Sequence, residues 1–165
     1  MFALYNCWAN KRLFVCAAQL TPEALAENRR AFFRSLLGTL NHLLVTDGIW
    51  MSRLEGLSPR GTTLDELQHE NLDGLATARY ALDQRILEFV FGLNEDRLAE
   101  SLNYASTVGV PHSQPLYQVL SHLFNHQTHH RGQAHHVIGL AIGRDKAPVL
   151  DLLAYQRSVT SMDQP

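Results

Sequence analysis

Apolar side chains recur at helical spacing over most of this chain. From Leu4 to about Ala18 they repeat at steps of three to five residues, which predicts an amphipathic helix. Thr21 can then cap a short helical turn that has Pro22 in its first position. The next segment, from Arg30 to Leu54, is strongly apolar and lacks proline, so we expect one long helix that ends near Gly56.

A loop should follow at Gly56–Gly61, which contains two glycines, a serine and a proline. Beyond it, Thr63 and Glu66 have the spacing of a capping box, and apolar residues continue at helical spacing up to Gly92. These signals predict a third helix that starts at Thr63.

The helical period fades between residues 94 and 112, where a short extended segment or hairpin is expected before Pro111. A fourth long helix should begin after Ser113 and Pro115 and end at Gly143. The tail after about residue 144 shows no clear pattern. Four helices with short or moderate connections predict an all-α four-helix bundle, and the length of 165 residues indicates a single domain spanning 1–165.

Composition and charge exclude several classes of partner. The chain has 14 Lys and Arg against 16 Asp and Glu, so it lacks the basic surplus that nucleic acid binding requires. We expect neither a membrane span nor a signal peptide, and a reducing cytoplasm is the expected location. Cys7 and Cys16 should lie on opposite sides of the first helix and stay unpaired.

Histidine is the unusual residue, with nine in total and five between His126 and His136. His122, His126 and His130 are spaced by four and therefore lie along one helical face. Two imidazoles at this spacing can bind one metal ion, although a helical histidine more often bonds a neighbour or faces solvent. His129 and His136 fall near the same face, so spacing alone leaves the ligand set open.

His42 adds to this hypothesis because it is the only histidine in a leucine-rich helix, where burial of a lone polar ring is costly. A metal bound by three histidines keeps coordination positions open for water or substrate. No general base stands out. Asp47 lies about 140° around the helix from His42, which favours a structural role.

For several other polar and aromatic residues the sequence predicts a role less specifically. Arg131 is expected to form a buried ion pair or a dimer contact. Trp50, Trp8 and Tyr104 can line a pocket or belong to the core. His112, like His69, is expected to be a solvent or loop residue.

Three segments together resemble the DinB family: the residues YNCWAN at 5–10, NHLL at 41–44 with Asp47 and Trp50, and HLFNHQTHHRGQ at 122–133. The resemblance spans nearly the whole chain. It implies a DinB/YfiT-like four-helix bundle, often a homodimer, and a metal held by His42, His126 and His130. His122 and His129, with Asp47 and Trp50, then become candidates for neighbours of the ligands or for the pocket wall.

Family relatives use zinc or nickel, and include thiol S-transferases and metal-dependent hydrolases. The resemblance therefore implies an enzyme that activates water or a thiol, with a small-molecule substrate such as a low-molecular-weight thiol. The competing hypothesis is a non-catalytic, dimerising module in which the metal only stabilises the bundle.

Overall fold

The computed structural model describes residues 1–58 and 63–162. These residues are mostly helical and include one small antiparallel sheet of two strands. In chain order the elements are α1 (Phe2–Ala17), α2 (Pro22–Ala26), α3 (Leu36–Leu54), α4 (Leu72–Phe91), α5 (Glu95–Ala99), β1 (Ser101–Ala105), β2 (Pro111–Pro115), α6 (Leu116–Ile142), the 3-10 turn η1 (Arg144–Lys146) and α7 (Leu152–Met162).

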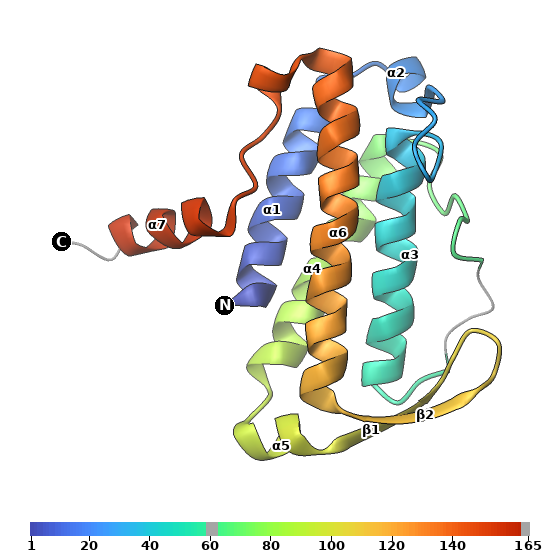
Figure 1. Cartoon of the computed structure of the whole chain (residues 1–165), viewed down its shortest axis with the longest axis vertical. Helices are drawn as coiled ribbons and strands as arrows, with labels where there is room; N and C mark the ends of the chain where they lie inside the picture. Colours follow the sequence, from blue (N-terminus) through green and yellow to red (C-terminus); the bar gives the residue numbers. More distant parts are fainter. Residues whose placement is uncertain (59–62, 163–165) are drawn as a thin grey trace.

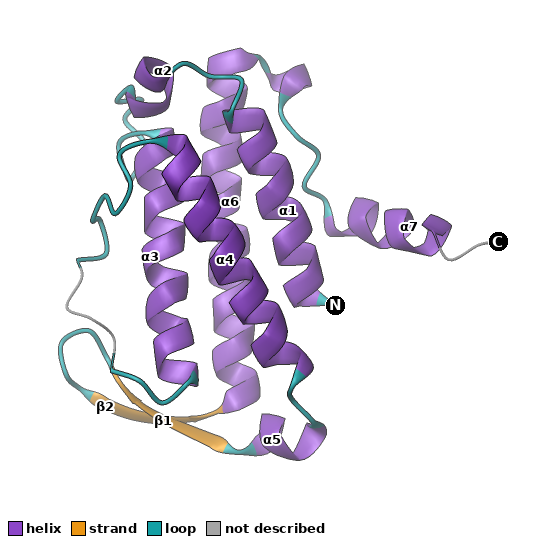
Figure 2. Cartoon of the chain, turned by 180° about the vertical axis from the view of Figure 1, so that it is seen from behind, coloured by secondary structure: helices purple, strands orange, loops and turns teal. Residues whose placement is uncertain are grey.

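The four long helices lie side by side (Figures 1 and 2). Each of α1 and α3 contacts both α4 and α6, so the four enclose one shared core. The largest completely buried apolar side chains come from all four: Leu13, Leu36, Leu40, Met51, Leu75, Ile86, Leu123 and Ile138. Removal of this apolar surface from water is the main force that holds the helices together.

Several expected boundaries are confirmed. The hydroxyl of Thr21 accepts a hydrogen bond from the backbone N–H of Ala24, so it caps α2 as predicted. Gly143 ends α6 with φ of +97°, a backbone conformation that glycine adopts without strain. Both cysteines are free.

The predicted start of the second long helix at Arg30 is wrong. Arg30 and Arg34 both have positive φ, which interrupts a right-handed helix, and α3 begins only at Leu36. Its cap is Ser35, whose hydroxyl accepts from the N–H of Gly38. Phe33 therefore lies in a loop before α3.

The capping box predicted at Thr63 is also wrong. Asn71 caps α4 instead, since its side-chain oxygen accepts from the N–H of Gly74. Residues 63–71 form turns and bends, so Leu64 belongs to the connection between α3 and α4. Of the predicted loop at 56–61, residues 59–61 lie outside the described part of the chain.

The expected extended segment before the last long helix is a hairpin. Strand β1 pairs with β2 in antiparallel register, with Tyr104 opposite His112. The hairpin lies across the ends of α3 and α6 (Figures 1 and 2). It thereby places Tyr104 and His112 beside α3 and α6.

The tail after residue 144 is more regular than predicted, because it contains η1 and α7. Helix α7 extends to the side of the four long helices (Figures 1 and 2). Tyr155 of α7 packs against Tyr5 and Trp8, whose ring centroids lie 5.9 and 5.5 Å away. Trp8 therefore belongs to this aromatic contact.

None of the helices within 1–58 and 63–162 combines the length and apolar character needed to cross a membrane.

Candidate metal centre

His42 of α3 and His126 and His130 of α6 lie together where these two helices pack. One ring nitrogen from each residue can be chosen so that all three nitrogens lie within 4.8 Å of one another. Among the described residues, this is the only group of three or more such side chains close enough to share one metal ion. The arrangement is compatible with a metal site.

Two of the rings are oriented by hydrogen bonds at Nδ1. The Nδ1 of His42 lies 2.7 Å from the carbonyl oxygen of Leu64, and the Nδ1 of His130 lies 2.8 Å from Oε1 of Gln133. Since an oxygen of this kind only accepts, each Nδ1 must carry the proton in the neutral ring. The lone pair of each ring is then on Nε2, as in ligating histidines held by an outer partner.

The two Nε2 atoms are 3.3 Å apart. Two lone pairs at this distance repel each other unless a proton or a cation lies between them. Ligands at about 2.0–2.1 Å from a tetrahedral ion are separated by about 3.3–3.4 Å. The spacing of His42 and His130 therefore fits a shared metal ion.

His126 completes the group. Its Nδ1 is buried and has no hydrogen-bond partner among the described residues, which is costly. Coordination of a metal by this nitrogen would remove that cost. Burial, with smaller contributions from the neighbouring histidines, lowers the pKa of His126 to about 3. Burial also lowers the pKa of His42 and of His130, so the rings are neutral and can donate lone pairs at pH 7.

A phenyl ring covers one side of the histidines. Phe33 stacks on His42 with ring centroids 3.8 Å apart and 19° between the planes, and its ring lies 5.5 Å from that of His130. Sequence reasoning placed Phe33 inside a helix and gave no role to Leu64 or Gln133. Only the loops around 28–35 and 63–71 bring Phe33 and Leu64 to the site, and no local pattern signals this.

A cavity of about 300 Å³ opens beside His42 and His126. Its lining comes from α3, from α6, from residue 64 and from the hairpin: His42, Thr46, Ile49, Trp50, Arg53, Leu64, Tyr104, Ser106, Thr107, His112, His122 and His126. Among the described residues that line this cavity there is no aspartate or glutamate. A volume of this size suits a small molecule.

The predicted neighbours are distributed around this site. Trp50 and His122 both line the cavity, with ring centroids 5.0 Å apart. His129 is exposed, and its ring centroid lies 4.8 Å from that of His130. His112, expected to be a solvent or loop residue, is exposed as predicted but lies in strand β2, where its ring also stacks on Tyr104 and lines the cavity.

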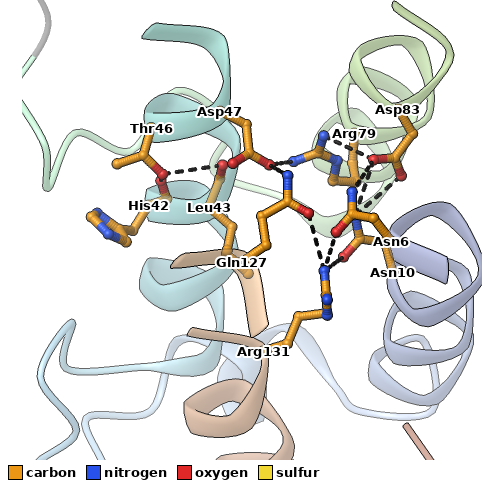
Figure 3. A network of polar contacts seen from close by, with 10 residues as sticks. All are labelled: Asn6, Asn10, His42, Leu43, Thr46, Asp47, Arg79, Asp83, Gln127 and Arg131. Atoms are coloured by element: carbon orange, nitrogen blue, oxygen red, sulfur yellow. Dashed lines mark hydrogen bonds and ion pairs between the residues drawn. The ribbon is translucent and has the colours of Figure 1, made fainter. Parts of the chain in front are cut away.

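Asp47 is absent from the described lining of this cavity, so the structural role favoured by its angle from His42 describes it better than the alternative role as a pocket residue. Figure 3 shows His42 and Asp47 on different sides of α3, as the angle between them requires. The completely buried carboxylate of Asp47 accepts from Arg79 at 2.6 Å and from Gln127 at 2.8 Å. Its role is to bond α3 to α4 and α6.

Asp47 is one part of a buried polar network that joins the four long helices (Figure 3). Arg79 also pairs with Asp83 at 2.9 Å, and Asp83 accepts from Asn6 and Asn10 of α1. Arg131, predicted to form a buried ion pair or a dimer contact, is buried and donates to Asn6, Asn10 and Gln127. The network thus contains two carboxylates and two guanidinium groups, so its formal charges sum to zero.

Comparison with known proteins identifies relatives of this chain. The family model described as DinB family matches residues 1–161. The curated protein "Protein DinB" of Bacillus subtilis (strain 168) is 25% identical over 138 residues, which cover 78% of this chain and 77% of that protein. Because the match spans almost the whole chain, this protein belongs to the DinB family.

Proposed function

We propose that this protein is a metal-dependent enzyme in which His42, His126 and His130 hold one divalent ion, zinc or nickel. The observation that carries the proposal is the convergence of three neutral imidazoles beside a cavity with no acidic residue in its described lining. With three protein ligands, the ion would keep a coordination position free for water or substrate.

A divalent ion bound here would lower the pKa of a coordinated water or thiol and so supply a nucleophile at neutral pH. The chain's own residues prepare the site for this chemistry. Leu64 and Gln133 orient two of the rings, and Phe33 covers them. His122, whose pKa burial lowers, faces the cavity as a neutral base that can accept a proton.

The reaction we propose is hydrolysis or S-transfer from a low-molecular-weight thiol, as the family resemblance implies. The proposal includes a DinB/YfiT-like four-helix bundle, formed by α1, α3, α4 and α6 as a single domain, that assembles as a homodimer. The family match and the packing of the four long helices support the bundle.

The test combines metal analysis with turnover. Purified protein should contain about one zinc or nickel ion per chain, and a panel of thiol-conjugation and ester or amide substrates should reveal activity that chelation abolishes and metal restores. His136→Ala, an exposed histidine on the same helix α6, is the matched control and should retain both metal and activity. Activity that is indifferent to chelation would reject the enzyme proposal. Metal that raises thermal stability without any turnover would favour the non-catalytic module.

A further inference from the structure

Arg53 is a buried cation in the wall of the cavity that adjoins the histidines. Its side chain is 93% buried, since only 7% of its surface is exposed, and its Nε has no hydrogen-bond partner among the described residues. The guanidinium carbon lies 4.6 Å from the ring centroid of Trp50 and 5.2 Å from that of Tyr104. The two aromatic rings therefore hold Arg53 in place by cation–π contact.

No carboxylate of the described residues lies within ion-pair distance of Arg53. Two arginines of α4, by contrast, are paired: Arg79 with Asp47 and Asp83 in the interior, and Arg85 with Glu55 on the surface. A buried charge without a counter-ion is costly. With a divalent ion held by neutral imidazoles as well, the cavity would carry excess positive charge that an anionic ligand can neutralise.

The guanidinium of Arg53 and a metal ion held by the histidines would be the two positive charges of the site, and their separation sets the length of such a ligand. Arg53 follows His42 by eleven residues on α3, which is about three turns, about 20° of rotation and a rise of about 16 Å. Both side chains line the same cavity, and the long arginine side chain shortens the gap between them. A ligand that reaches both ends must be elongated, with its anionic group several bonds away from its reacting atom.

We propose that Arg53 binds a carboxylate of the substrate, at the end of the cavity opposite the three histidines. This inference rests on the proposed function, because it extends the same site. Cation–π contact with the two rings consumes none of the guanidinium N–H donors, so these can form a charge-assisted bond to a carboxylate. A single guanidinium suits one carboxylate better than a phosphate, which usually gathers several donors.

The experiment measures binding by calorimetry to zinc-loaded protein. The probes are a series of ω-mercaptocarboxylates of increasing chain length, each compared with the mercaptoalcohol of equal length. The carboxylate should bind about 10- to 100-fold more tightly than the alcohol at the length that spans the cavity, as expected for hydrogen bonds to a charged group. Arg53→Met should remove this preference and leave the affinity for the alcohol unchanged.

Arg85→Met is the matched control, because it removes the same charge from an exposed ion pair on α4 and should preserve the preference. Circular dichroism and metal content of both variants establish that they are folded and loaded. Equal binding of acid and alcohol at every length, or a preference that survives Arg53→Met, would overturn the inference.

Metal-free protein separates this inference from the proposed function. Hexanoate alone should bind the wild-type protein and not Arg53→Met, whether or not zinc binds. If zinc fails to bind while the Arg53-dependent affinity for hexanoate persists, the proposed function fails and the carboxylate site stands. If zinc and mercaptoalcohols bind but hexanoate shows no dependence on Arg53, the carboxylate site fails alone.

Discussion

His42 and His130 face each other with Nε2 atoms 3.3 Å apart, although 88 positions separate them in the chain. Each ring donates through Nδ1 to an oxygen, so neither Nε2 has a proton to share in the neutral state. The pair is therefore arranged as two lone pairs directed at one point, which is the geometry that a cation needs.

Replacement of His126 by alanine tests the ligand set. His126→Ala should lose one of three ligands and weaken zinc binding by roughly 100-fold or more, since loss of outer partners alone costs about 10- to 100-fold. Helical content should be largely unchanged, because the core side chains are untouched. Competition with a chromophoric chelator measures the affinity, and His136→Ala is the control. Unfolding of His126→Ala in circular dichroism would indicate a structural ion instead.

Gln133 should contribute to metal affinity without touching the metal. Its Oε1 accepts from the Nδ1 of His130 and fixes the orientation of that ring. Gln133→Ala should weaken zinc binding by about 10- to 100-fold. Gln118→Ala, an exposed glutamine on the same helix, should have no effect in the same chelator titration. Equal affinities for the two variants would show that His130 needs no partner.

Arg79 should be essential to stability. It is 3% exposed and pairs with both Asp47 and Asp83, so Arg79→Leu leaves two buried carboxylates without their counter-ion. The free energy of unfolding should fall by about 3–5 kcal/mol, as measured by chemical denaturation. Arg85→Leu breaks an ion pair in which the arginine is 42% exposed, and should cost at most about 1 kcal/mol. Similar losses for both variants would argue against the network as a source of stability.

Asp47 should make stability depend on pH. Burial raises its pKa to about 6, although Arg79 and Gln127 oppose the shift. The folded state thus holds this proton more tightly than the unfolded chain, whose aspartates titrate near pH 4. The contribution is fully present below about pH 4 and is lost as the pH rises through about 6.

The measurement is the free energy of unfolding of wild-type protein minus that of Asp47→Asn, which lacks the titrating group. This difference should fall by up to ~3 kcal/mol between about pH 4 and about pH 7. A difference that stays constant, or that rises with pH, would mean that Asp47 is ionised throughout this range in the folded protein.

Local patterns in the sequence were sufficient for much of the fold. The apolar period locates the four long helices, Thr21 caps α2 and Gly143 ends α6, because these signals act within a few residues of the backbone that they shape. They failed at Arg30, where an apolar run continues through residues whose positive φ breaks the helix, and at Thr63, where Asn71 caps α4 instead.

For the site, the helical spacing in the sequence determined that His126 and His130 share a face, and the leucine-rich surroundings of His42 made it a further candidate. The family resemblance then selected these three histidines from the set that spacing left open. Only the packing of α3 against α6 decided that the three rings meet, and only two loops and a hairpin brought Phe33, Leu64 and Tyr104 around them. The physical reason is that some interactions act between near neighbours in the sequence and others act between distant segments. Backbone hydrogen bonding and side-chain periodicity are local properties, whereas the direction in which a loop returns depends on the surfaces that it can bury.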